Sequence, residues 1–200
     1  MTYTLVQPPG DKPFSRMNKT EAVEYFEWFV GAIPDRLRVL EQAVQNSAEF
    51  EGWTANKSPR SLLDLGSWFA GQVGTQPATA SFSQFVKENL KAQNPLLPTY
   101  DTHFIPSDKT LSLTVDIGMY LGEVFTKNFQ RLHWGICDLE GNIDYNQPVI
   151  KGLRSIDNKT EIHCPTERLV HVLALGFINK TRSHSHLFEL YKKWSPSSPD

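Results

Sequence analysis

The segment from Ser107 to Phe129 constrains the fold more than any other part of the sequence. Its apolar residues leave no clean polar face: Leu111, Leu113, Val115, Ile117, Met119, Leu121, Val124 and Phe125. Alternation over residues 111–115 would also suit a strand, but the apolar character persists for too many residues for one strand. A helix that is apolar all round belongs in the middle of a core. We therefore expect a central buried helix at about residues 107–129.

Helical patterns precede this segment. Asn18 and Glu21 form a sequence that resembles a capping box, which predicts a helix from Lys19 to Val30. Pro34 suits the first turn of a second helix, and the short connection favours an antiparallel helix pair. A third helix is expected after Pro59, followed by a loop over residues 70–81 and a fourth helix over residues 82–93.

The pattern changes after the central helix. Residues 132–137 and 143–150 are strand-like and flank a turn, which predicts an antiparallel hairpin with Pro148 at an edge or a bulge. Helices are expected from Pro165 and from Ser185 to Trp194. The whole predicts a mostly helical α+β domain over residues 18–194, preceded by an irregular arm (1–17) and followed by a disordered tail (195–200).

Composition and charge exclude several classes of protein. The formal net charge is −2 with the charges dispersed, so the basic footprint of a nucleic-acid-binding protein is missing. No run approaches the roughly 18 apolar residues of a membrane span, and residues 1–13 carry no secretion signal. Cys137 and Cys164 are expected to be free thiols in a reducing compartment. These features predict a cytoplasmic protein that binds neither nucleic acid nor membrane.

Two carboxylates of the central helix are the candidate catalytic residues. Asp116 and Glu123 lie seven residues apart, so on a helix they share a face, with Tyr120 between them. Such a pair can act as acid and base or hold a metal. The alternative is structural: Glu123 accepts a hydrogen bond from a neighbouring strand or an indole N–H, and Asp116 lies near a helix end. We favour the structural interpretation, because an acid–base pair normally comes with further polar residues at defined spacing.

The histidines and cysteines predict no metal site and no cofactor. None of them has the paired Cys-x₂-Cys or His-x₃-His spacing typical of zinc ligands. His163 and Cys164 are adjacent, but adjacent side chains rarely point at one another, which argues against a nucleophile–base pair. The sequence also lacks a Gly-x-Ser-x-Gly motif and the glycine-rich motifs of nucleotide-binding loops.

An aromatic run in the first predicted helix allows two interpretations. Tyr25, Phe26, Trp28 and Phe29 point to both sides of that helix. Either all four are buried in a helix covered on both faces, or Tyr25 and Trp28 form an exposed anchor for a protein partner. The second interpretation rests on the prominence of Trp and Tyr in interface hot spots.

Several short motifs resemble a loose set of uncharacterised bacterial cytosolic proteins. The shared features are a buried Tyr-x-Gly-Glu helix, a Trp-bearing strand and a strand with Gln-Pro, here Tyr120, Gly122, Glu123, Trp134, Gln147 and Pro148. Residues 24–29 and 33–36 also resemble some members. The resemblance implies a bacterial origin and an α+β fold, with no established activity.

Two hypotheses about function follow from the sequence. The first is a non-enzymatic protein-binding module, of the kind that bacterial immunity or accessory proteins represent. The alternative is a small hydrolase or metal-dependent enzyme that uses Asp116 or Glu123. A carboxylate that is packed and fully hydrogen-bonded favours the first, and a deep pocket with converging polar groups favours the second.

Overall fold

The computed structural model describes residues 3–79, 104–155 and 159–196. These residues form a mostly helical α+β domain with one two-stranded and one three-stranded antiparallel sheet. The predicted fold class is therefore confirmed. The expected helix over residues 82–93 lies outside the described residues, as do residues 197–200 of the expected tail. None of the helices in the described ranges combines the length and apolar character that crossing a bilayer requires.

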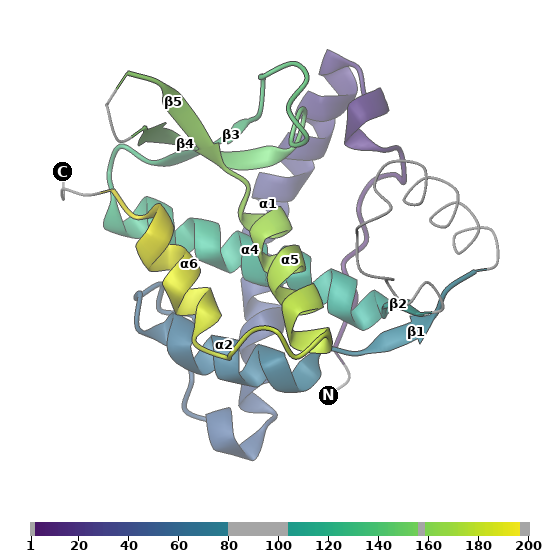
Figure 1. The fold of residues 1–200 in the computed structure, drawn as a ribbon, viewed down its shortest axis with the longest axis vertical. Coiled ribbons are helices and arrows are strands. Elements are labelled where there is room, and N and C mark those ends of the chain that lie inside the picture. The colour runs from purple at the N-terminus through teal and green to yellow at the C-terminus, as the bar shows by residue number, and fades with distance from the viewer. Residues whose placement is uncertain (1–2, 80–103, 156–158, 197–200) are drawn as a thin grey trace.

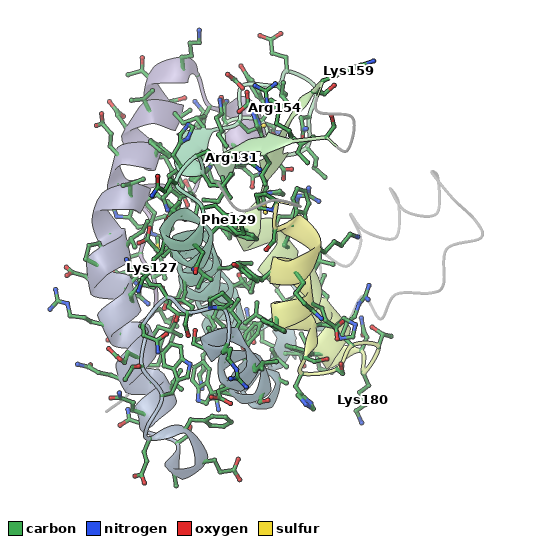
Figure 2. All side chains as sticks on the ribbon, turned by 90° about the vertical axis from the view of Figure 1, so that its left-hand side faces the viewer. Lys127, Phe129, Arg131, Arg154, Lys159 and Lys180 are labelled. Carbon is green, nitrogen blue, oxygen red and sulfur yellow. The ribbon has the colours of Figure 1, made fainter. Side chains whose placement is uncertain are left out.

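The central helix is α4, Asp108–Asn128, and it confirms the strongest sequence prediction. The Ser107 side chain caps it by accepting a hydrogen bond from the Thr110 backbone N–H. Helices α1, α2 and α5 and strands β3 and β4 all pack against it. Figure 2 shows α1 along one side of the molecule, α4 inside and α6 on the opposite side. Most of its apolar residues are buried: Leu113, Ile117, Met119, Leu121, Val124 and Phe125 have no exposed surface. Two others are not, because Leu111 near the start of the helix is 37% exposed and Val115 is only partly buried.

The expected antiparallel pair at residues 19–44 is wrong, because α1 is one continuous helix from Lys19 to Gln45 with Pro34 inside it. An interior proline removes one helical hydrogen bond and costs about 3 kcal/mol. Pro34 and Val30, whose carbonyl loses its partner, both face solvent, so water can satisfy that carbonyl. The buried stripe continues in phase through the proline and offsets the cost: Tyr25, Phe29, Ile33, Leu37, Leu40 and Val44.

The three-stranded sheet has the order β3-β4-β5, with β3 His133–Ile136, β4 Pro148–Arg154 and β5 Glu161–Cys164. The predicted hairpin is confirmed, but its second strand begins only at Pro148 and residues 143–147 belong to the turn. Pro148 starts the central strand rather than an edge, and a first strand position tolerates the missing N–H. The irregularity in β4 falls instead near Gly152, at φ +92°. Strand β5 was not expected.

The remaining elements enclose α4. Helix α2 spans Ser61–Gln72, α5 Thr166–Ile178 and α6 His186–Trp194, close to the predicted helices. The predicted loop at 70–81 contains a short strand, β1 Thr75–Pro77, which pairs with β2 Phe104–Pro106. Short 3₁₀ turns occur at Phe14–Arg16 and Ala48–Phe50. Figure 1 shows the three-stranded sheet at one end of the molecule, beside the first turns of α1.

Candidate functional site

Asp116 lies in the middle of α4 rather than near a helix end, and it is fully buried. Its two oxygens accept hydrogen bonds from Arg36 Nε and Nη2, each at 2.7 Å, and Oδ2 also accepts from the Tyr3 hydroxyl at 2.5 Å. Burial raises the pKa of Asp116, and the Arg36 guanidinium and the Tyr3 hydroxyl oppose that rise. The carboxylate therefore joins α4 to α1 and to the segment before α1.

Tyr120 is buried one helical turn further along α4. Its hydroxyl lies 2.7 Å from the Ser61 hydroxyl and accepts a hydrogen bond from the Lys57 backbone N–H at 3.0 Å. The ring packs edge-on against Trp53, with centroids 5.4 Å apart. Burial raises the pKa of Tyr120 above its ordinary value, so the hydroxyl stays protonated at neutral pH. Tyr120 thus fixes the loop before α2 onto the central helix.

Glu123 is bound on both oxygens. The Lys57 ammonium lies 2.6 Å from Oε2, and the Trp134 indole N–H donates to Oε1 at 3.0 Å. The indole bond is the structural interaction expected from the sequence. An open hollow of about 440 Å³ lies above this pair, bounded by Ala55, Asn56, Lys57, Glu123, Thr126 and Lys127. Lys57 has a left-handed backbone, at φ 59°, and its side chain is satisfied by Glu123.

Asp116, Tyr120 and Glu123 share one face of α4 as expected, but they do not converge on one cavity. Asp116 is bound by α1, whereas Lys57 in the loop before α2 binds both Tyr120, through its backbone N–H, and Glu123, through its side chain. Strand β3 adds the Trp134 indole bond to Glu123. Within the described residues, no group of three or more His, Cys, Asp or Glu side chains could hold a metal ion. The hydrogen bonds of these three side chains therefore hold α1, the loop before α2 and β3 against the central helix.

The cysteines and His163 are arranged differently from their order in the sequence. His163 turns away from its neighbour Cys164 and places Nδ1 3.5 Å from Cys137 Sγ. Strands β3 and β5 pair with β4 from opposite sides, and Cys137 comes directly after the last residue of β3. Cys137 and Cys164 are free and buried, and burial raises the pKa of both thiols. A protonated, enclosed thiol is a poor nucleophile.

Tyr25 and Trp28, the predicted aromatic anchor, do not form a jointly exposed pair in the structure. Tyr25 is only 7% exposed, and its ring packs between Phe14 and Trp28. Trp28 is partly buried against the core. Tyr25 is therefore part of the packed interior and is not presented to a partner.

A larger hollow, of about 730 Å³, is lined by the first turns of α1 together with β3, β4 and the β3–β4 loop. Its apolar wall comes from α1, β3 and the loop: Ala22, Val23, Phe26, Ile136 and Tyr145. Its charged residues are Lys19, Glu24, Asp138, Glu140 and Lys151, of which Asp138 and Lys151 pair at 3.1 Å. The size is within the range of pockets that bind ligands or side chains of a partner.

The β3–β4 loop beside this hollow is held from within. Asp144 is 5% exposed and accepts hydrogen bonds from Arg168 Nε and Nη2 at 2.5 and 2.7 Å. Asn146, in the left-handed region at φ 67°, donates its side-chain N–H groups to the carbonyls of Phe14 and Met17. The loop therefore has two buried polar anchors, one on α5 and one on the segment before α1.

The same loop carries two exposed aliphatic side chains, which are not among the residues that line the hollow. Leu139 is 45% exposed and Ile143 is 75% exposed, the latter more than any other large apolar residue among those described. Val23, which lines the hollow from α1, is also exposed. We call the hollow together with Leu139 and Ile143 the Ile143 surface. A single exposed aliphatic residue is ordinary, but several around a hollow on a braced loop indicate a contact surface.

Sequence reasoning missed the Ile143 surface. The available signal was an isoleucine within the polar turn Glu140-Gly-Asn-Ile-Asp144, where apolar residues have no core to enter. Comparison of the chain with family models, with curated proteins and with solved structures gives no match in any of the three. Inference about function therefore rests on the geometry of the chain itself.

Proposed function

We propose that this chain is a non-enzymatic protein-binding module that contacts its partner through the Ile143 surface. The observation that carries the proposal is the construction of the β3–β4 loop. Asp144 and Asn146 fasten it from the inside, while Leu139 and Ile143 face solvent beside the hollow. A preorganised loop loses little conformational entropy on binding, so most of the free energy gained by burying its apolar side chains contributes to affinity.

The state of the polar residues supports binding over catalysis. Glu123 is occupied on both oxygens, and Asp116 is paired with Arg36 in the interior. A hydrolase that used these carboxylates would need them to converge on one substrate, whereas they contact separate elements. The free thiols and the sequence resemblance favour a cytoplasmic location. One role that fits such a binding module is that of an immunity-type protein, which neutralises a toxin by binding to it.

The expected energy of the contact is sizeable. Full burial of an aliphatic side chain contributes about 1.5–3 kcal/mol relative to exposure. Because Ile143 is already three-quarters exposed at 75%, its burial by a partner would deliver most of that amount. Replacing it by serine should therefore weaken binding by about tenfold or more, since 1.4 kcal/mol corresponds to a factor of ten.

Affinity capture tests the proposal. Purified wild-type chain serves as bait in extract of the cells that naturally make it, beside Ile143→Ser and the matched control Val172→Ser. Val172 is 50% exposed on α5 and lies outside the Ile143 surface. The proposal predicts a stoichiometric partner that the wild type and the control retain and Ile143→Ser loses. Capture that is equal for all three baits, or no partner at all, would refute it.

A further inference from the structure

We infer that the partner of the Ile143 surface presents a cationic segment with aliphatic side chains. This inference rests on the proposed function and adds the chemistry of the partner. The aliphatic part follows from the hollow and from Leu139 and Ile143 beside it. The cationic part follows from the charges around them.

Carboxylates predominate among the uncompensated charges of this surface. Glu24 and Glu140 line the hollow, and Glu27 is exposed nearly one turn further along α1. None of the three has a hydrogen-bond or ion-pair partner among the described residues. The other acidic residues nearby are neutralised, Asp138 by Lys151 and Glu21 by Lys12.

The cations of the surface do not balance these carboxylates. Lys151 is used by Asp138, which leaves Lys19 as the lining cation without a carboxylate partner in the described chain. Lys19 lies about a turn and a half before Glu24 along α1, too far along the helix for a direct pair. The hollow is lined by three carboxylates and two ammonium groups, and the exposed Glu27 adds a further negative charge on α1 beyond it, so the local field is negative.

The negative sign of this field determines which binding partners are favoured at the Ile143 surface. Cationic groups are attracted to it, which raises the association rate and disfavours acidic partners. A second copy of the chain would bring the same three carboxylates towards one another in a two-fold interface, so self-association through this surface is disfavoured. A segment with basic residues around leucine-like side chains satisfies both the apolar hollow and the charge.

Two fluorescent peptides provide the probe. Both place leucine at helical i, i+3 and i+4 positions, and the other positions are lysine in one peptide and glutamate in the other. We expect the Lys/Leu peptide to bind the wild type at least tenfold more tightly than the Glu/Leu peptide by fluorescence anisotropy. Its affinity should fall as salt rises from low to high ionic strength, because exposed charges are screened. Ile143→Ser should lose most of the binding.

A charge reversal separates local recognition from net charge. Glu24→Lys combined with Glu140→Lys should reverse the preference towards the Glu/Leu peptide. Glu49→Lys combined with Glu51→Lys changes the net charge equally at exposed positions outside the surface and should preserve the wild-type preference. Equal binding of the two peptides, or the same reversal in both double variants, would overturn the inference. If the inference fails while Ile143→Ser still loses the captured partner, the proposed function stands and only its cationic chemistry is wrong.

Discussion

Gly122 on α4 offers the sharpest test of how the central helix packs. A Cβ at this position would lie 2.0 Å from Trp134 Cζ2 and 2.3 Å from Cη2, well inside van der Waals contact. The indole cannot retreat freely, because it donates to Glu123 and packs edge-on against Phe29 at 5.1 Å. Gly122→Ala should therefore displace the ring and strain both contacts.

The magnitude follows from three opposing effects. Overpacking costs about 1–3 kcal/mol, and loss of a buried hydrogen bond costs a similar amount. Alanine recovers about 1 kcal/mol over glycine within a helix. The net loss in the free energy of unfolding should be about 3 kcal/mol, which lowers the Tm by about 6–12 °C for a chain of this size. Urea and thermal unfolding followed by far-UV circular dichroism measure both quantities.

Gly31 supplies the matched control. It lies in α1, it is exposed, and a Cβ there would meet no atom within 4 Å. Gly31→Ala should stabilise the chain by about 0.5–1 kcal/mol through helix propensity alone. In a Trp134→Leu background, the cost of Gly122→Ala should fall below about 1 kcal/mol. A Gly122→Ala variant as stable as the wild type would refute the contact between α4 and β3.

Three further substitutions test the carboxyl groups of Asp116 and Glu123 on α4 and of Glu167 in the first turn of α5. Asp116→Asn should destabilise by about 3–5 kcal/mol in chemical unfolding, because it leaves Arg36 uncompensated. Glu123→Gln should cost about 1 kcal/mol, since the amide can still accept from Trp134 but no longer pairs with an ammonium; a Tm at or above wild type would instead favour a functional carboxylate. Burial raises the pKa of Glu167 to about 7, so ionisation of this group should lower the free energy of unfolding as the pH rises from about 4.5 to 7. Glu167→Gln should therefore be more stable than the wild type at pH 8, by up to about 3 kcal/mol, and as stable as the wild type at pH 4.

An exposed ion pair supplies the control for Asp116→Asn. Asp35→Asn removes a carboxylate from an exposed pair with Arg38 and should change stability by less than about 1 kcal/mol. A loss for Asp116→Asn no larger than this control would show that the buried pair is not needed. For Glu167, the sign is fixed by proton binding: the folded chain holds the proton up to a higher pH than the unfolded chain. A stability gain between pH 4.5 and 7 that disappears in Glu167→Gln would contradict it.

Periodicity along the chain predicted much of the fold. The apolar run of α4 and the stripes of α5 and α6 come from residues three and four positions apart, so local sequence carries the signal. Pro34 misled the prediction because its cost depends on which side of the helix faces water, and the in-phase stripe from Phe29 to Leu37 was the better guide. Strand β5 has four residues and needs β4 as its partner, so its own sequence carries little signal.

The interactions of the candidate site were harder to predict from the sequence than the helices were. Asp116 and Glu123 were correctly placed on one face, but Arg36 lies 80 positions from Asp116 and Lys57 lies 66 positions from Glu123. Such pairs are fixed by packing, so the sequence could not say that both carboxylates were satisfied. The Ile143 surface likewise depends on a loop that is braced by Arg168, 24 positions away from Asp144.

Hydrogen–deuterium exchange of the chain with and without its captured partner tests the central claim most directly, because it reports which backbone segments the partner covers. The account predicts new protection in two segments only, the first turns of α1 over residues 19–27 and the β3–β4 loop over residues 137–147. Protection should be unchanged around Lys57 and Glu123. Protection confined to the hollow beside Lys57 and Glu123, with the β3–β4 loop unaffected, would contradict the proposed binding surface and return attention to that carboxylate.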